Sequence, residues 1–219
     1  MEETEQPKPP AMAPNKKHTH LKVVVIRDWK EYFGEAVLII FSVLLALILT
    51  EVINAIHEKQ LTKEYLQNIR NELIQNKTKE EEQYAYQLQV LKNIDSALNN
   101  PNFQQQIISD GEFRLKLIAS SGILYRYLED ISWQVAKQHN IESKIDLQDL
   151  SALTNIYQEQ NRIMKSEDEI ARVVLDRESR NPANARITLK LIRDNYHGWA
   201  VDRAESLLKE YQKEIDNLK

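Results

Sequence analysis

An uncharged apolar run at residues 36–50 constrains this chain more than any other feature of its sequence. Fifteen helical residues span only about 22 Å, whereas the hydrocarbon core of a bilayer is about 30 Å thick. Apolar neighbours extend the run to residues 34–56, which is long enough to cross. Ser42 is the only polar residue in 36–49, so the helix would be apolar on every face, unlike an amphipathic surface helix. We therefore expect a transmembrane helix over 34–56.

Both ends of this predicted transmembrane helix carry residues typical of a membrane–water interface, where aromatic rings and terminal carboxylates are tolerated. An interfacial helix over residues 21–33 is expected to lead into it. A role in an ion or proton path stays open for the carboxylates of Glu35 and Glu51. The residues expected at the interface are Trp29, Tyr32, Phe33, Glu35 and Glu51.

The charge distribution around the apolar run predicts an orientation. Lysine and arginine outnumber acids between residues 16 and 30, whereas bases and acids are mixed in 57–76. The positive-inside rule then places the N-terminus in the cytoplasm and the C-terminal domain in the periplasm or outside the cell, with the helix in the inner (cytoplasmic) membrane. A cleaved signal peptide is disfavoured because no small-x-small site follows the run. A soluble protein with 36–50 as its central core helix remains an alternative.

The remaining composition favours an all-α fold. The chain has only 4 glycines and 6 prolines in 219 residues, and good helix formers dominate after residue 57. The proline-rich tail 1–20 is expected to be disordered and cytoplasmic. No proline occurs between Lys16 and Asn100, which predicts that the transmembrane helix continues into a long helical stalk. The polar stretch 76–83 interrupts the apolar stripe and is interpreted as a solvated turn of helix or a kink.

Residues 57–219 are expected to form one extramembrane helical domain, an antiparallel bundle. Asn99-Asn100-Pro101 should end the first helix, Asp110-Gly111 should form a turn, and Asp146 should be the N-cap of a long helix that Asn181-Pro182 ends. The other expected helices cover residues 103–108, 113–119 and 183–217, and one more begins at Ile123 and is closed by His139-Asn140.

Part of the sequence resembles a family of uncharacterised bacterial single-span membrane proteins of the DUF6090-like type. The resemblance is clear over about residues 28–77 and weaker to Gln160. It is carried by an aromatic-rich entry with Gly34-Glu35, an apolar span that Glu51 and Asn54 close, and Leu66-x-x-Ile69-x-x-Glu72-Leu73-x-x-Asn76. Related proteins often have tryptophan where this chain has Val52. The resemblance implies a single span with a helical extramembrane domain, and no known activity.

Sequence motifs for catalysis or cofactor binding are absent. The chain has no cysteine, and it contains no Gly-rich phosphate loop, HExxH or GxSxG motif. We therefore expect no catalytic residue and no cofactor. His18 and His20 have no further ligands nearby, so no metal site is expected. The small net charge of −4, with acids and bases interleaved, argues against a nucleic-acid partner.

An aromatic group in the middle of the chain has two interpretations: plain core, which we favour, or the lining of a small-molecule pocket. Its members are Tyr125, Tyr127, Trp133 and His139.

The expected partners are the lipid bilayer and an unidentified protein. Ser42, Ala46 and Thr50 lie on one helix face and are small enough to let two spans approach closely, so homo-oligomerisation and simple packing against lipid are both open. The sequence thus favours a non-catalytic membrane-anchored helical interaction or scaffold module. The alternative is a ligand-binding sensory ectodomain, which would need a separate signalling partner because so few residues precede the span.

Overall fold

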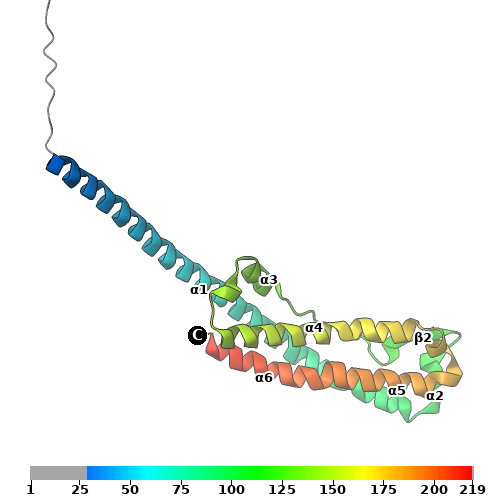
Figure 1. Cartoon of the computed structure of the whole chain (residues 1–219). Helices are drawn as coiled ribbons and strands as arrows, with labels where there is room; N and C mark the ends of the chain where they lie inside the picture. Colours follow the sequence, from blue (N-terminus) through cyan, green and yellow to red (C-terminus); the bar gives the residue numbers. More distant parts are fainter. Residues whose placement is uncertain (1–28, 219) are drawn as a thin grey trace, which may run out of the picture. The chain divides into compact units, whose positions relative to one another are not determined.

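The computed structural model describes residues 29–218 (Figure 1). Predictions for the tail 1–20 and for residues 21–28 of the interfacial helix lie outside these described residues. Over the part described, the fold is all-α as predicted. The helices are α1 (Trp29–Leu98), α2 (Pro101–Ile107), α3 (Ile131–Gln138), α4 (Leu147–Leu175), α5 (Ala185–Tyr196), a π-helix (His197–Val201) and α6 (Asp202–Asn217).

Helix α1 is 70 residues long and ends where the sequence predicts. Asn100 follows it, and its side-chain oxygen accepts a hydrogen bond from the N–H of Phe103 at 3.1 Å. This cap starts α2, with Pro101 at the first helical position, where its missing N–H costs nothing. The chain divides into two compact units, one ending at Ile53 and the next beginning at Asn54, so α1 contributes to both.

The second unit is a bundle of long helices around one apolar core. Side-chain contacts fix their directions: Glu72 and Asn76 of α1 bond to Tyr157 and Gln160 of α4, which makes α1 and α4 parallel. Asp95 near the end of α1 pairs with Arg193 of α5 at 3.0 Å, and Arg70 donates to the carbonyl of Ile215 in α6, so α5 and α6 run antiparallel to α1. The largest fully buried side chains include Ile69, Leu73, Ile94, Leu153, Ile163, Tyr196 and Tyr211.

The predicted start of α4 is confirmed, but α4 ends at Leu175, before the break predicted at Asn181-Pro182. The Asp146 carboxylate accepts from the N–H groups of Gln148 and Asp149 at 2.8 and 3.0 Å, satisfying two donors that the first turn of α4 leaves unpaired. After α4, the Asn181 side chain, which directly precedes Pro182, accepts a hydrogen bond from the N–H of Ala183. Short 3₁₀ turns at Ile141–Ser143, Glu178–Arg180 and Pro182–Asn184 complete these connections.

The predicted last helix is interrupted by a π-helical turn between α5 and α6. Four of the buried residues there, Ile192, Tyr196, Ala200 and Ala204, are spaced four apart. At 100° per residue, each step of four overshoots a full turn by about 40°, so three such steps would carry the stripe about 120° off the core. A π-helical turn holds more residues per turn and absorbs this excess. It therefore keeps both α5 and α6 facing the core.

The connection from α1 to α4 differs from the sequence prediction in two places. Residues 123–130 are not helical, and only α3 remains of the helix expected from Ile123 to the closure at His139-Asn140. The helix expected over 113–119 is reduced to a 3₁₀ turn, Leu115–Leu117, after a two-residue strand. The reason for the larger difference lies in the side chains that α1 presents to this connection.

The predicted turn at Asp110-Gly111 is confirmed as the tip of a small hairpin. It joins β1 (Ile108–Ser109) to β2 (Glu112–Phe113), with Ile108 opposite Phe113. Asp110 and Gly111 have φ angles of 58° and 75°, the left-handed conformation that a two-residue hairpin turn requires.

Candidate functional site

The core-facing side of α1 carries five buried polar side chains at helical spacing, and we call this set the polar seam: Glu72, Asn76, Glu80, Gln83 and Gln87. Their steps of four, four, three and four continue the stripe of buried apolar residues on the same helix. All five are at most 6% exposed, while Glu81 and Glu82 beside them face solvent. The interpretation of residues 76–83 as a solvated turn of helix is therefore wrong: α1 continues and buries Asn76, Glu80 and Gln83.

Three members of the polar seam and two further residues of α1 bind the backbone of the connecting segment 118–132, which runs antiparallel to α1. Together they replace the helical hydrogen bonds that residues 123–130 do not make. In order along α1, the contacts are Glu72 Oε2 with the N–H of Ser132 (2.7 Å), Asn76 with the N–H (2.9 Å) and C=O (2.6 Å) of Glu129, Gln83 Oε1 with the N–H groups of Tyr125 and Arg126 (3.0 Å each), Tyr86 OH with the C=O of Gly122 (2.7 Å), and Asn93 with the C=O of Ile118 (2.9 Å).

Gln160 of α4 joins this segment to the rest of the bundle. Its oxygen accepts from Asn76 at 3.1 Å and from the Tyr211 hydroxyl at 2.7 Å, and its nitrogen donates to the C=O of Glu129 at 2.8 Å. Tyr211 is fully buried, and burial raises the pKa of its hydroxyl well above the ordinary value, so it stays a donor. Three helices and the connecting segment therefore meet in one satisfied hydrogen-bond network.

Glu80 and Gln87 are the two members of the polar seam that make no hydrogen bond to this network, and Glu80 is the ionisable one. It is 0% exposed, and neither of its carboxylate oxygens has a hydrogen-bond partner. Burial raises the pKa of Glu80 from 4.5 to about 7; the Gln87 amide opposes this rise only in part, and its contact falls outside hydrogen-bond geometry. Because an unpaired buried carboxylate is unfavourable, Glu80 holds a proton at mildly acidic pH.

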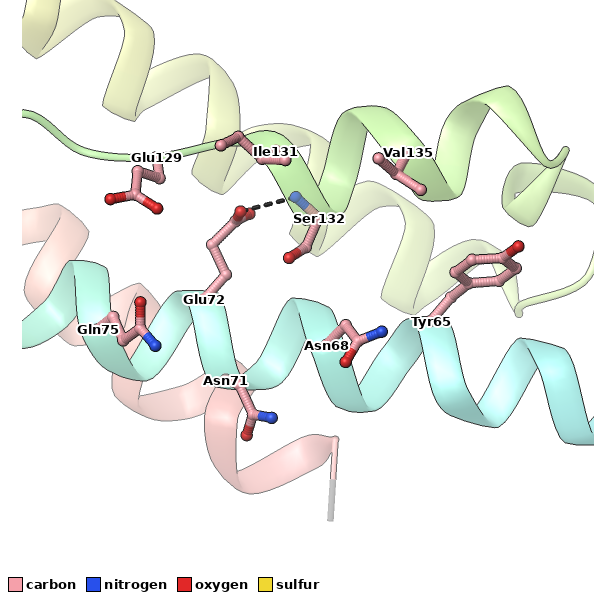
Figure 2. A pocket seen from close by; sticks show the side chains of 9 residues that line it. All are labelled: Tyr65, Asn68, Asn71, Glu72, Gln75, Glu129, Ile131, Ser132 and Val135. Atoms are coloured by element: carbon pink, nitrogen blue, oxygen red, sulfur yellow. Dashed lines mark hydrogen bonds between the residues drawn. The ribbon is translucent and has the colours of Figure 1, made fainter.

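A pocket of about 380 Å³ opens between α1 and α3, next to the Glu72 end of the polar seam (Figure 2). Its α1 side carries mostly amides and a carboxylate, and its α3 side carries apolar residues. The lining residues are Tyr65, Asn68, Asn71, Glu72, Gln75, Glu129, Ile131, Ser132 and Val135. Figure 2 shows the Glu72 side chain reaching from α1 toward Ser132.

Two neutral donors hold the Glu72 carboxylate in place. The Tyr157 hydroxyl donates to Oε1 at 2.6 Å and the N–H of Ser132 donates to Oε2 at 2.7 Å. Tyr157 is itself fixed, because its ring stacks on Trp133 with 5.5 Å between centroids. Burial, and then the bond to Glu72, raise the pKa of Tyr157. The site is therefore a rigidly held carboxylate that is only 6% exposed.

The residues predicted at the membrane interface lie on the first part of α1, and all five are exposed. On the predicted association face, the Ser42 hydroxyl donates to the carbonyl of Leu38 and the Thr50 hydroxyl to that of Ala46, at 2.8 and 2.9 Å. Both hydroxyls are thus satisfied within their own helix.

The structure does not bring the four central aromatic residues together. Trp133 is buried as predicted for core, but Tyr125 packs edge-on against Tyr86, Tyr127 is 57% exposed, and His139 is exposed and stacks on Tyr65. The interpretation of this group as one core cluster is wrong for three of its members. Among the described residues, no group of three or more acidic, histidine or cysteine side chains could hold a metal ion.

No protein-family model matches the chain, and neither a curated protein nor a solved structure matches it. The site therefore has to be interpreted from its own geometry. Sequence analysis missed the polar seam, although one signal was present: its five polar residues occupy the stripe on which apolar residues precede and follow them. The α3 side of the pocket had no such signal, because its position depends on the non-helical segment.

Proposed function

We propose that this protein is a single-span, membrane-anchored helical module that works by interaction and not by catalysis. The observation that carries this proposal is the change of environment along α1. Every side chain from residue 32 to residue 60 is exposed, whereas the same helix lines the bundle core from Ile69 onward. Helix α1 is long and apolar enough to cross a membrane.

The energetic argument concerns the apolar side chains of this exposed part. Burying one large apolar side chain contributes about 1.5–3 kcal/mol, and nothing in the described residues covers the run that includes Leu38, Phe41 and Leu45. A bilayer covers such a helix on all sides at once. The backbone needs no further partner, because an α-helix satisfies its own hydrogen bonds.

The proposed topology places the N-terminus in the cytoplasm and the bundle on the opposite side of the inner membrane of a bacterium. This topology rests on the excess of basic residues before the span. The resemblance to the single-span family supports the same arrangement, and we propose a relationship to that family on those residues alone. A second copy of the chain and an unidentified protein remain the proposed partners. Close packing through Ser42, Ala46 and Thr50 is the basis proposed for self-association.

Cell fractionation with matched arginine variants tests the anchor. The full-length chain should sediment with membranes, resist an alkaline wash and enter solution only with detergent. Leu44→Arg combined with Leu47→Arg costs about 2.5–3.5 kcal/mol per arginine at the bilayer centre, so this variant should move to the supernatant. The control, Ala85→Arg with Gln89→Arg, adds the same charge at exposed positions of α1 in the bundle and should still sediment. Native chain in a detergent-free supernatant contradicts the proposal.

A second candidate function is ligand binding by the bundle, with a separate protein carrying the signal. The observation that favours it is the pocket beside Glu72. Its volume lies in the range of small-molecule sites, and a nearly buried carboxylate forms part of its lining. A ligand there would contact both α1 and α3, so binding could alter how the connecting segment lies on α1.

A further inference from the structure

The charged residues that line the pocket between α1 and α3 are all acidic. Of its nine lining residues, only Glu72 and Glu129 are charged, and none is basic. Lys79 pairs with Glu129, which is half exposed. Glu72 is different, because its two partners are neutral donors and it forms no ion pair with a lysine or arginine among the described residues. The pocket therefore presents a fixed negative charge without a counter-charge.

The environment of Glu72 makes this charge effective. Water reaches only 6% of the residue, so a positive group placed against it is screened less than at an open surface. The amides of Asn68 and Gln75 line the same pocket and make no side-chain hydrogen bond to another described residue. Their oxygens are acceptors, and an ammonium group has three donors to share among such acceptors.

The opposite side of the pocket is apolar and open. Ile131 and Val135 of α3 are 64% and 41% exposed, and the Tyr65 ring of α1 also lines the pocket. A hydrocarbon chain would cover these side chains, whereas a metal ion would not. Ca²⁺ and Mg²⁺ also require six or more oxygen ligands, and a single nearly buried carboxylate supplies too few.

We propose that the pocket between α1 and α3 binds a small primary amine, with its ammonium group against Glu72 and its hydrocarbon part against Ile131 and Val135. This inference rests on the second candidate function and deepens it by assigning the ligand class. It does not depend on the membrane anchor.

Calorimetric titration of the full-length chain in detergent tests the proposal with 1,5-diaminopentane as the probe. The neutral comparison is 1,5-pentanediol, which has the same carbon chain and hydroxyl groups in place of the ammonium groups. The diamine should bind saturably with a dissociation constant of about 1 mM or lower, as expected for a ligand of this size. The diol should bind at least about tenfold more weakly, because it lacks the charge-assisted bond to Glu72. Equal affinities, or no saturable diamine binding, overturn the proposal.

Two lysine variants separate the pocket from general charge effects. Asn68→Lys places an ammonium group at the exposed edge of the pocket and should weaken diamine binding about tenfold or more. Ala85→Lys makes the same charge change at an exposed site of α1 outside the pocket and should leave affinity within about twofold. Equal losses in both variants would show non-specific attraction and overturn the proposal.

Glu72→Gln tests the assigned carboxylate directly. It should abolish saturable binding while the amide oxygen still accepts from Ser132 or Tyr157; unchanged binding overturns the proposal. If this variant does not fold, the comparison of Asn68→Lys with Ala85→Lys decides the question, since Asn68 and Ala85 are both exposed. Failure of binding leaves the membrane proposal intact, because sedimentation of the same variants with membranes is scored separately.

Discussion

Replacing Glu80 with glutamine should change how the stability of the bundle depends on pH. Glu80 is 0% exposed, and burial raises its pKa from 4.5 to about 7. The hydroxyls of Tyr196 on α5 and Tyr211 on α6 are the titratable groups of neighbouring helices whose charges couple to it. Both stay neutral in this range, since burial raises their pKa values too. The pH dependence assigned to this site therefore belongs to Glu80.

The sign follows from proton binding. The folded state holds the Glu80 proton up to about pH 7, whereas the unfolded state releases it near 4.5. Between these values the folded state binds more protons, so the free energy of unfolding falls as pH rises and is level on either side. At about 1.4 kcal/mol per pKa unit, the loss across this window is about 3 kcal/mol. The contribution is complete below pH 4.5 and absent above about pH 7.

The measurement is urea unfolding of the full-length chain in detergent, followed by tryptophan fluorescence at a series of pH values. Glu80→Gln keeps the shape of the protonated acid but cannot ionise. Its stability relative to the native chain should therefore rise by about 3 kcal/mol between acidic pH and about pH 8. Glu81→Gln, at an exposed position paired with Lys77, should change by less than about 1 kcal/mol. If the difference in free energy of unfolding between Glu80→Gln and the native chain does not change with pH, the reasoning is refuted.

Other predictions concern single contacts. Asn76→Ala removes both bonds to the backbone of Glu129 and should cost about 1–3 kcal/mol, with faster hydrogen exchange at the Glu129 amide; unchanged exchange would contradict the account of the polar seam. Asp146→Ala should lower the free energy of unfolding by about 1 kcal/mol through loss of the cap, measured by urea unfolding. Gly198→Ala should raise it by about 0.4–1 kcal/mol, because a Cβ there meets no atom within 4 Å. Gly111→Ala should lower it by about 1–2 kcal/mol, because its φ of 75° is unfavourable for alanine; equal effects of the two glycine changes would refute this.

The elements that could be predicted from the sequence are those set by local rules. The apolar stripe and the absence of proline predicted the continuous α1, Asp146 predicted the start of α4, and Asp110-Gly111 predicted the hairpin turn. In each case the deciding groups are neighbours in the chain. The continuity of α1, the start of α4 and the hairpin turn therefore followed from the sequence.

The polar seam and the pocket could not be predicted because they depend on tertiary contacts. Residues 123–130 contain enough apolar residues to indicate a helix, but Gln83 and Asn76, some 40 to 50 positions earlier, bind their backbone. Those bonds form only once the segment lies on α1, so tertiary hydrogen bonds override local propensity here. The π-helical turn was recognisable in part, since its buried residues repeat every four positions.

Single-cysteine labelling tests the membrane anchor most directly, because the native chain has no cysteine. Cysteine would be placed at Thr19 in the tail, at Leu44 in the apolar run and at Ala85 in the bundle, and intact cells without an outer membrane would be treated with a membrane-impermeant maleimide. The account predicts labelling of Ala85→Cys in intact cells, of Thr19→Cys only after permeabilisation, and of Leu44→Cys only after denaturation in detergent. Labelling of Leu44→Cys to the same extent as Ala85→Cys, in chains that remain soluble without detergent, would contradict it.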